Sequence, residues 1–358
     1  MSSGKQEFNE HASKRTTSMR FTLSLVASVL AALTTAASAG GQQPDRGFAS
    51  SARARALPGA YQGRRDAERT DRFAYKGKIG RDGRLSLANI DGSIVVTGGS
   101  GDEVSIEAVK QARGNQQDLN AVDIIVDARA GHVDVQTRYR SRNVRIAVSY
   151  TVTVPTSTSV ELKSISGDIR VTDVQGSVRA ESISGNVTTS GTPRLESARS
   201  ISGDVDLAGS GDEGVLTASS VSGSVRAKGF KARSLEANTV SGDIFLTDLV
   251  CDRVGVQSIS GNVEFSGSFN RNGRYDFNSH SGDVRLGLTD STGFEFTANT
   301  FSGSVRSDLP LTFDGTGDRG GRRGRQSFGG RAMRATFGDG SAVLSIRTFS
   351  GNIVISRR

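Results

Sequence analysis

The sequence is poor in the residues that build large cores and covalent cross-links. Its 358 residues include no tryptophan, five prolines and one cysteine, and aromatic residues make up 6% of the chain. The single Cys251 excludes an internal disulfide, so an oxidising compartment is neither required nor excluded. The chain has 44 glycines, however. Abundant glycine with few large side chains favours a repetitive β architecture with many tight turns.

Long apolar runs are also scarce, and the longest lies near the N-terminus. Residues 21–33 are mostly apolar, follow basic residues and precede Ala37-Ser38-Ala39, which is typical of an export signal. We expect translation to start at Met19 and cleavage to follow Ala39. An uncleaved anchor is the alternative, but a span takes about 20 apolar residues and no later stretch is long enough. The mature chain is therefore expected to be soluble and exported, to the periplasm, the cell surface or the medium.

The net charge of +8 is unevenly distributed. Residues 40–75 carry seven arginines against four acids, and residues 315–334 carry six arginines against Asp318. Once the signal is also set aside, the rest of the chain is slightly acidic. Basic character therefore belongs to two segments and not to the folded body.

Composition and pattern divide the chain into six parts. Alternating apolar and polar residues begin after residue 77, and a regular repeat begins after Pro155. The segment before residue 78 has no apolar period, which is typical of disorder. The predicted parts are a signal peptide (1–39), a disordered arginine-rich lead-in (40–77), a β cap (78–157), β-solenoid repeats (158–310), a Gly/Arg-rich insert (311–341) and a final β-coil (342–358).

The repeat is seen when the chain is aligned on nine glycines, of which the first eight are 18 to 21 residues apart. Serine precedes every one of them, Ser or Thr stands three residues before, and Ile or Val stands two residues after. The residue five before is always small or apolar. The nine are Gly167, Gly185, Gly203, Gly223, Gly242, Gly261, Gly282, Gly303 and Gly351.

One repeat of this length predicts one coil of an all-β solenoid. The inward Ile and Val would stack on their equivalents in the next coil, and the backbone would pair with the coils on either side at about 4.8 Å. Glycine would supply the positive φ of a tight corner, with the adjacent Ser, Asp or Asn bonding to corner amides. The ends of such a stack need covers, so the cap would cover one end and residues 342–358 would add a last coil.

Several of these segments resemble a known family. They are Leu-Ala-Asn-Ile-Asp-Gly-Ser-Ile-Val-Val from residue 87, Val152-Thr153-Val154-Pro155, the Ser-Gly-Asp-Val corners, and the closing Leu-Ser-Ile-Arg-Thr-Phe-Ser-Gly-Asn-Ile. Together, over about residues 80–358, they resemble the bacterial "beta strand repeat-containing" putative-adhesin family. The resemblance implies an exported β-solenoid of unknown biochemistry and assigns no catalytic residues. Both arginine-rich segments depart from the family pattern.

The residue after each corner glycine is Asp, Asn or Ser, a column that invites comparison with stacked calcium sites. Five of its nine members are neutral, whereas calcium needs six to eight oxygen ligands with clustered carboxylates. A structural corner ladder is therefore favoured over a metal site. The column consists of Asp168, Asn186, Asp204, Ser224, Asp243, Asn262, Asp283, Ser304 and Asn352.

Other candidate sites are fewer. His280 interrupts an otherwise apolar column, and we expect it to pack flat on its neighbours in preference to binding metal with Asp276 or Asp283. The acidic residues Glu161, Glu181, Glu196, Glu236 and Glu264 share no single column. No nucleophile, phosphate-loop or paired-carboxylate pattern is present. We expect no catalytic centre, no cofactor and no metal.

The arginine-rich insert is the remaining candidate. It resembles the arginine-glycine segments that bind RNA, but export favours a cell-surface polyanion or acidic glycan over a specific nucleic acid. A solvated loop without a ligand is equally consistent with the pattern. The residues concerned are Arg319, Arg322, Arg323, Arg325, Arg331 and Arg334.

Three functions remain open at this point. The first is a non-enzymatic, adhesin-like surface protein that binds anionic glycans or surfaces. The second is a periplasmic envelope scaffold or stress-related module that binds a protein partner. The third, less favoured, is a polysaccharide-active β-helix enzyme. Salt-dependent binding, salt-insensitive binding and product release would distinguish them.

Overall fold

The computed structural model describes residues 69–112, 116–141, 145–209, 214–289, 292–313, 328–329 and 333–358. All of them belong to one compact unit, Gly63–Arg358. The predicted signal peptide and most of the predicted lead-in lie outside the described residues. No helix among the described residues is long and apolar enough to cross a membrane.

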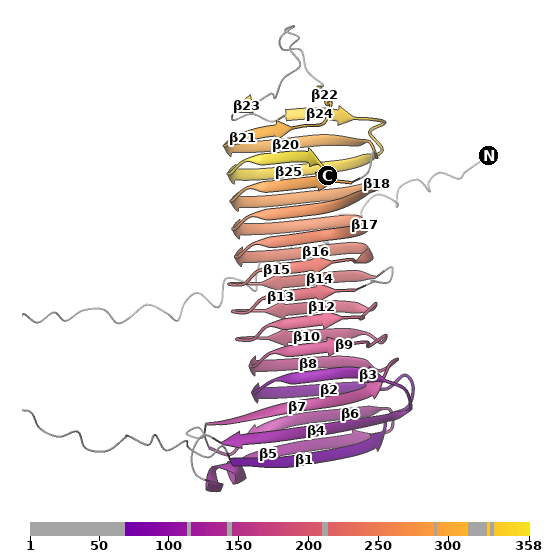
Figure 1. Cartoon of the computed structure of the whole chain (residues 1–358), viewed down its shortest axis with the longest axis vertical. Helices are drawn as coiled ribbons and strands as arrows, with labels where there is room; N and C mark the ends of the chain where they lie inside the picture. Colours follow the sequence, from indigo (N-terminus) through magenta and orange to yellow (C-terminus); the bar gives the residue numbers. More distant parts are fainter. Residues whose placement is uncertain are drawn as a thin grey trace, which may run out of the picture. The chain divides into compact units, whose positions relative to one another are not determined.

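The β-solenoid prediction is confirmed, since parallel strands stack coil upon coil (Figure 1). Each coil contributes one strand to each of two facing ladders. One ladder aligns Val160 with Val178, and the other aligns Ile169 with Val187 and Val205. The strands of the first seven coils in the stack are β2 (Arg84–Asp91), β3 (Ile94–Gly99), β8 (Ser159–Ser166), β9 (Ile169–Thr172), β10 (Val178–Ser182), β11 (Val187–Ser190), β12 (Leu195–Ser200), β13 (Val205–Ala208), β14 (Val215–Ser220), β15 (Val225–Lys228), β16 (Lys231–Ser241), β17 (Ile244–Ser260) and β18 (Val263–Ser281). β17 and β18 run through a bend, so each serves two successive coils.

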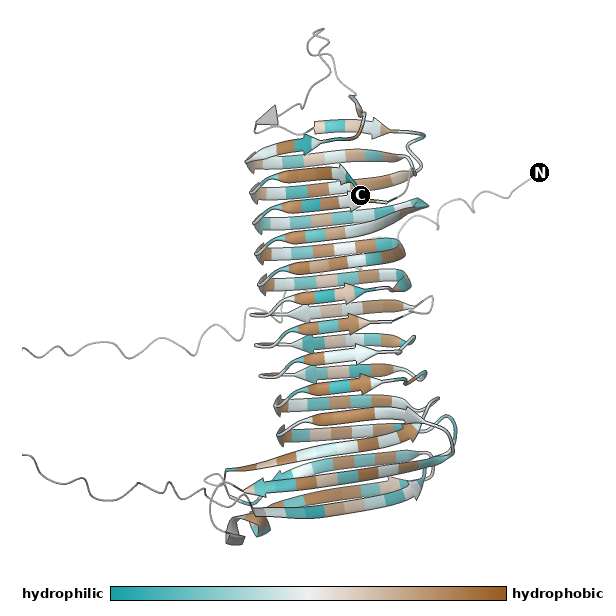
Figure 2. Cartoon of the chain, in the orientation of Figure 1, coloured by the Kyte–Doolittle hydropathy of each residue, from teal (hydrophilic) through white to brown (hydrophobic). Residues whose placement is uncertain are grey.

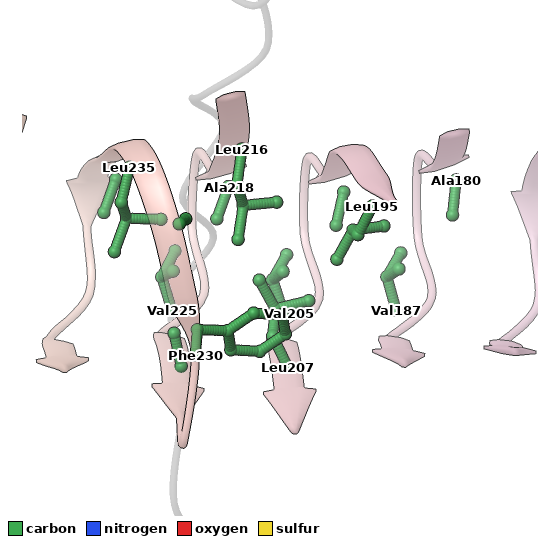
Figure 3. Packing of buried hydrophobic residues seen from close by; sticks show 14 of the residues in the cluster. Ala180, Val187, Leu195, Val205, Leu207, Leu216, Ala218, Val225, Phe230 and Leu235 are labelled. Atoms are coloured by element: carbon green, nitrogen blue, oxygen red, sulfur yellow. The ribbon is translucent and has the colours of Figure 1, made fainter. Parts of the chain in front are cut away.

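The core is the space between the two ladders. Alternate residues point inward, which gives the strands the banded hydropathy of Figure 2. Figure 3 shows Ala180, Leu195 and Ala218 facing Val187, Val205 and Val225 across this space, and all six are at most 5% exposed. Small residues on one side oppose branched residues on the other, which explains why the chain needs few large side chains.

The corner glycines are required mainly because there is no space for a side chain. A Cβ on any of the nine would overlap the carbonyl oxygen of the corner glycine in the coil beneath, as Gly185 would overlap Gly167. Only Gly242, Gly261, Gly282 and Gly303 also have positive φ. The expectation that positive φ explains all nine is therefore wrong for the other five. Close approach of two backbones explains the whole column.

Polar side chains at the corners bond from coil to coil. The backbone N–H of Asn186 donates to Oδ1 of Asp168 at 2.8 Å, and the N–H of Asp204 donates to Oδ1 of Asn186 at 2.8 Å. At five of the corners, the inward hydroxyl three residues before the glycine bonds to the corner carbonyl of the adjoining coil; Ser200, for example, donates to the Gly185 carbonyl at 2.8 Å. Both sets of bonds tie a corner to the corner of the adjoining coil.

The cap covers one end of the stack with antiparallel strands. β6 and β7 extend the two ladders beyond β2 and β3, and β5, β4 and β1 then add antiparallel strands outside them. The elements are β1 (Arg69–Lys78), β4 (Glu103–Ala112), the 3-10 helix η1 (Gln116–Ala121), β5 (Val122–Arg129), β6 (His132–Tyr139) and β7 (Ile146–Pro155). Asn89 joins the cap to the first coil: its Nδ2 donates to the Val148 carbonyl at 2.8 Å and its Oδ1 accepts from Thr137 at 2.9 Å.

Two predicted boundaries need correction here. Residues 69–77, assigned to the disordered lead-in 40–77, form most of β1, in which Phe73 and Tyr75 pack against the core between exposed neighbours. Residues 84–99, assigned to the cap 78–157, form the first coil of the stack, in register with β8 and β9. In residues 69–77, the arginines made the alternation of apolar and polar residues hard to recognise. In residues 84–99, the corner is Asp91-Gly92 and not the Ser-Gly of the later coils.

The position of the final coil also differs from the prediction. β25 (Ala342–Ser350) pairs with β18 on one side and with β20 (Phe294–Ser302) on the other. β26 (Ile353–Arg357) lies likewise between β19 (Val284–Leu288) and β21 (Ser304–Ser307). The last coil is therefore inserted beneath the coil that precedes it in the sequence, as the yellow β25 beneath β20 shows in Figure 1. Repeat spacing alone does not encode this order.

The end of the stack above β20 is covered by antiparallel pairs. β24 (Met333–Phe337) pairs with β20, β22 (Thr312–Phe313) pairs with β24, and β23 (Phe328–Gly329) pairs with β21. β20 is therefore paired with β24 along one edge and with β25 along the other. The connection between them crosses Gly293, where a side chain would overlap the Asp339 backbone.

Candidate functional site

The predicted arginine contacts fall almost wholly outside the described residues. Arg319, Arg322, Arg323, Arg325 and Arg331 have no described position. Arg334 lies in β24, the covering strand, with its side chain exposed and its backbone opposite Thr297. The structure thus locates one member of the set at the end of the solenoid beyond β20.

Charged side chains gather over the ladder formed by β2, β8, β10 and β12. They line a shallow depression, which we call the charged groove, made of Glu161, Lys163, Arg179, Glu181, Ser197 and Arg199. Arg84 and Glu196 lie beside it and contact it through ion pairs. The groove combines residues from three successive coils because outward positions of neighbouring strands are in register.

Two carboxylates organise the groove. Glu161 accepts hydrogen bonds from Arg84 at 3.0 Å and pairs with Lys163 at 2.8 Å. Glu196 accepts from Ser177 at 2.5 Å and from Nε of Arg179 at 2.7 Å. Arg199, in contrast, forms no ion pair with another residue of the described ranges. Among the basic side chains of the groove, the guanidinium of Arg199 is therefore the one most available to a ligand.

The electrostatics of these carboxylates limit the chemistry of the groove. The hydrogen bond from Lys163 lowers the pKa of Glu161, and hydrogen bonds from Ser177 and Arg179 lower the pKa of Glu196. Both groups are ionised at neutral pH. Glycoside hydrolysis requires one carboxylic acid whose pKa is raised so that it can donate a proton. These two residues suit binding and not proton transfer.

The facing ladder carries a separate, self-paired cluster. Arg226 in β15 contacts Asp204 at 2.9 Å and Asp206 at 3.3 Å, and its guanidinium lies 5.7 Å from the ring centre of Phe245. The Asp204 hydrogen bond raises the pKa of Arg226, and the pKa of Asp204 is lowered in turn. This cation is already neutralised by two carboxylates, which makes it a poorer ligand site than Arg199.

His280 lies where the sequence analysis expected a flat contact. Its ring stacks on Phe349 with centroids 5.0 Å apart and planes 11° apart. Within the described residues, no three His, Cys, Asp or Glu side chains are grouped as a metal site would require. His280 therefore belongs to a stacked aromatic column.

Cys251, the only cysteine of the chain, lies in β17 with its side chain buried in the core. Burial raises the pKa of this thiol to about 11, so at pH 8 only about a thousandth of it is thiolate, the reactive form. We expect Ellman's reagent to label native protein very slowly and to label one thiol per chain completely in 8 M urea. Rapid labelling of the native protein would show that β17 opens readily.

The groove was missed by the sequence analysis, which found the acidic residues scattered. The signal lies in two outward columns of the repeat, four and six residues before the corner glycine. In the coils that end at Gly167, Gly185 and Gly203, five of these six positions are charged. In the next three coils only Glu236 is charged. The groove becomes visible when the outward positions of successive coils are aligned and acidic and basic residues are considered together.

Comparison with known proteins adds a family match and distant structural likenesses. No curated protein matches the chain. Similar solved structures include a putative adhesin from Bacteroides fragilis NCTC 9343 (12% identity, 80% of this chain, 97% of that chain, TM-score 0.42) and a putative lipid binding protein from Parabacteroides distasonis ATCC 8503 (10%, 80%, 97%, TM-score 0.41). A putative cell adhesion protein from Clostridium sporogenes ATCC 15579 also aligns (9%, 81%, 100%, TM-score 0.22). Residues 200–356, less than half of the chain, match the family model described as Toastrack DUF4097.

Proposed function

We propose that this protein is an exported, adhesin-like binding protein that holds an anionic polymer, such as an acidic glycan, along one face of its solenoid. The observation that carries the proposal is the charged groove, where Arg199 is an exposed cation without an ion-pair partner among the described residues. Export is supported by the signal-like pattern of residues 1–39.

The geometry of the groove favours an extended ligand. Lys163, Arg179 and Arg199 come from three successive coils whose strands lie about 4.8 Å apart, and Arg179 is offset by two residues along its strand from the other two. Each contact with a carboxylate or sulfate on the polymer would be weak, because exposed ion pairs contribute about 0.2–1 kcal/mol. Several contacts to one polymer add through effective concentration. The arginine-rich insert would raise the local polymer concentration through its charge.

This role predicts that binding to an acidic polysaccharide depends on Arg199. We expect Arg199→Gln to weaken retention on immobilised polygalacturonate about two- to fivefold at low salt, the range of one exposed ion contact. Raising NaCl from 20 to 300 mM should weaken the binding of the unaltered chain further. Affinity electrophoresis or biolayer interferometry measures both effects.

The matched control is Arg170→Gln, since Arg170 is an exposed arginine of β9 on the facing ladder. It removes the same charge without touching the groove. Equal weakening by the two variants would mean that only net charge matters. A third variant, with Arg319, Arg322, Arg323 and Arg325 changed to Gln, tests the insert, and unchanged binding would remove the insert from the proposal.

A protein-binding envelope scaffold is the second candidate. It is favoured by a column of exposed apolar side chains along the corners of the coils, and it predicts an interaction that is insensitive to salt. A polysaccharide-cleaving activity is less well supported because the pKa values of Glu161 and Glu196 are both lowered. Release of oligosaccharides from polygalacturonate, lost in a Glu161→Gln variant, would revive it.

A further inference from the structure

One outward position of every coil is apolar or aromatic, which gives the solenoid a hydrophobic edge. Eight of these side chains are between 36% and 73% exposed, although burial would be favourable for each. Strand register aligns them one above another, for example Ile90 beside Ile165 and His280 beside Phe349. We call this column the corner ridge: Ile90, Ile165, Ile183, Ile201, Val221, Val240, Ile259, His280, Phe349 and Phe301, in stacking order.

The aromatic end of the ridge is not arranged to bind sugar rings. Phe349 stacks between His280 and Phe301, with the two phenyl planes 4° apart and their centroids 4.8 Å apart. Face-to-face stacking hides the faces of Phe349 and turns ring edges toward the solvent. A sugar ring packs on an aromatic face, so the ridge offers an apolar edge instead.

On one side, the border of the ridge carries a single charge, Asp91 in the first coil. The next residue of each coil after the first is an exposed serine: Ser166, Ser184, Ser202, Ser222, Ser241, Ser260, Ser281, Ser350 and Ser302. On the other side, the outward residue two positions before each ridge residue is charged only at Lys163, Glu181, Arg199 and Arg347. A lipid surface with anionic headgroups or a polyanion would be held by a basic border. This border suits close contact with another apolar protein surface.

The regular spacing of the ridge side chains indicates which kind of partner the ridge fits. The ridge is straight and repeats at the coil spacing of about 4.8 Å over about 43 Å, a repeat that an irregular globular surface does not match. A second copy of this chain matches it at every step, because the side chains of one ridge fit between those of the other. We propose that two copies associate side by side through their corner ridges, in an antiparallel arrangement with two-fold symmetry, which closes the assembly at a dimer.

The size of the contact sets its strength. Ridge and borders together are about 13 Å wide, since they span about four residues of strand. The contact therefore covers on the order of 560 Å² per copy, below the roughly 800 Å² of a standard interface. We expect a dimer with a micromolar dissociation constant. This proposal does not rest on the polymer-binding role; in the antiparallel arrangement the charged grooves of the two copies lie toward opposite ends of the contact.

Sedimentation velocity of the full chain from 1 to 200 µM tests the association. We expect a concentration-dependent shift from monomer to dimer that persists in 0.5 M NaCl, because the contact is apolar. The triple variant Ile183→Lys, Ile201→Lys and Val221→Lys should raise the dissociation constant at least tenfold. The control is Val215→Lys, at an apolar position outside the ridge that is 56% exposed, more than the three ridge residues. An unchanged melting temperature shows that the triple variant is folded.

Cross-linking tests the arrangement. In an antiparallel pair, Val221 lies near the two-fold axis and Ile90 lies about 43 Å from its counterpart. A short bismaleimide should therefore link Val221→Cys chains and not Ile90→Cys chains, while the buried Cys251 stays unmodified. Linking of both variants would overturn the antiparallel arrangement. A monomer at every concentration, or loss of phosphatidylglycerol-vesicle binding as the only effect of the triple variant, would overturn the proposal.

Discussion

Replacing the corner glycine Gly203 by alanine should lower the free energy of unfolding by about 2–4 kcal/mol. The new methyl group would overlap the Gly185 carbonyl and the Asn186 amide of the adjoining coil. The two coils would have to separate to relieve this overlap, and their separation would strain the hydrogen bonds between the coils at the corner. Such overpacking against backbone usually costs about 1–3 kcal/mol or more. Because Gly203 is not among the glycines of positive φ, the loss would reflect space alone.

Urea denaturation followed by circular dichroism measures the change through the transition midpoint. Gly255→Ala is the matched control, since Gly255 lies in β17 and the nearest non-neighbouring atom, Cγ of Glu236, is 4.0 Å from where the new methyl group would lie. We expect that control to be neutral or slightly stabilising, because alanine loses less chain entropy than glycine on folding. If both variants were equally stable, the corners would be looser than the structure shows.

Ile346→Ala in the inserted coil should expose two strands that are not neighbours of each other. Ile346 is fully buried and aligns with Phe277 on one side and Ala298 on the other. Truncating a buried isoleucine costs about 2–5 kcal/mol, and the loosened coil leaves an edge of β18 and an edge of β20 without a stable partner. We expect hydrogen exchange to accelerate in both 274–281 and 294–302.

The two-sided response distinguishes an inserted coil from a terminal one. Had residues 342–358 been added beyond β20, loosening them would leave the 274–281 amides protected. Val343→Ala is the control on the same strand, because the side chain of Val343 points outward and is 46% exposed. It should leave both segments protected. Faster exchange in 294–302 alone would contradict the order of strands described above.

The coil architecture was predictable because it depends on local chemistry repeated many times. Each corner needs glycine where two backbones meet, and each coil needs an inward β-branched or small side chain at fixed offsets from that glycine. Those requirements appear directly as columns in the sequence. His280 follows the same logic, since its column is exposed and a flat ring fits on Phe349.

The order of the coils was not predictable in the same way. Ile346 and Ile353 would satisfy an end position as well as an internal one, because every coil presents the same inward surface to its neighbours. The position of the last coil depends on the path of the connections, here the crossing at Gly293 and the pairing of β24 and β25 with the two edges of β20. The charged groove was missed for a related reason: Glu161, Arg179 and Arg199 approach each other only when coils are stacked.

The inserted coil also governs when the molecule becomes complete. A nascent or damaged chain that ends before Ala342 still contains β20 and β21, yet the level that separates them from β18 and β19 is empty. Such a chain presents facing unpaired strands in both ladders, which are targets for proteases and for aggregation. Residues 342–358 thus complete the stack, because a chain without them lacks the strand pairs that join β18 and β19 to β20 and β21.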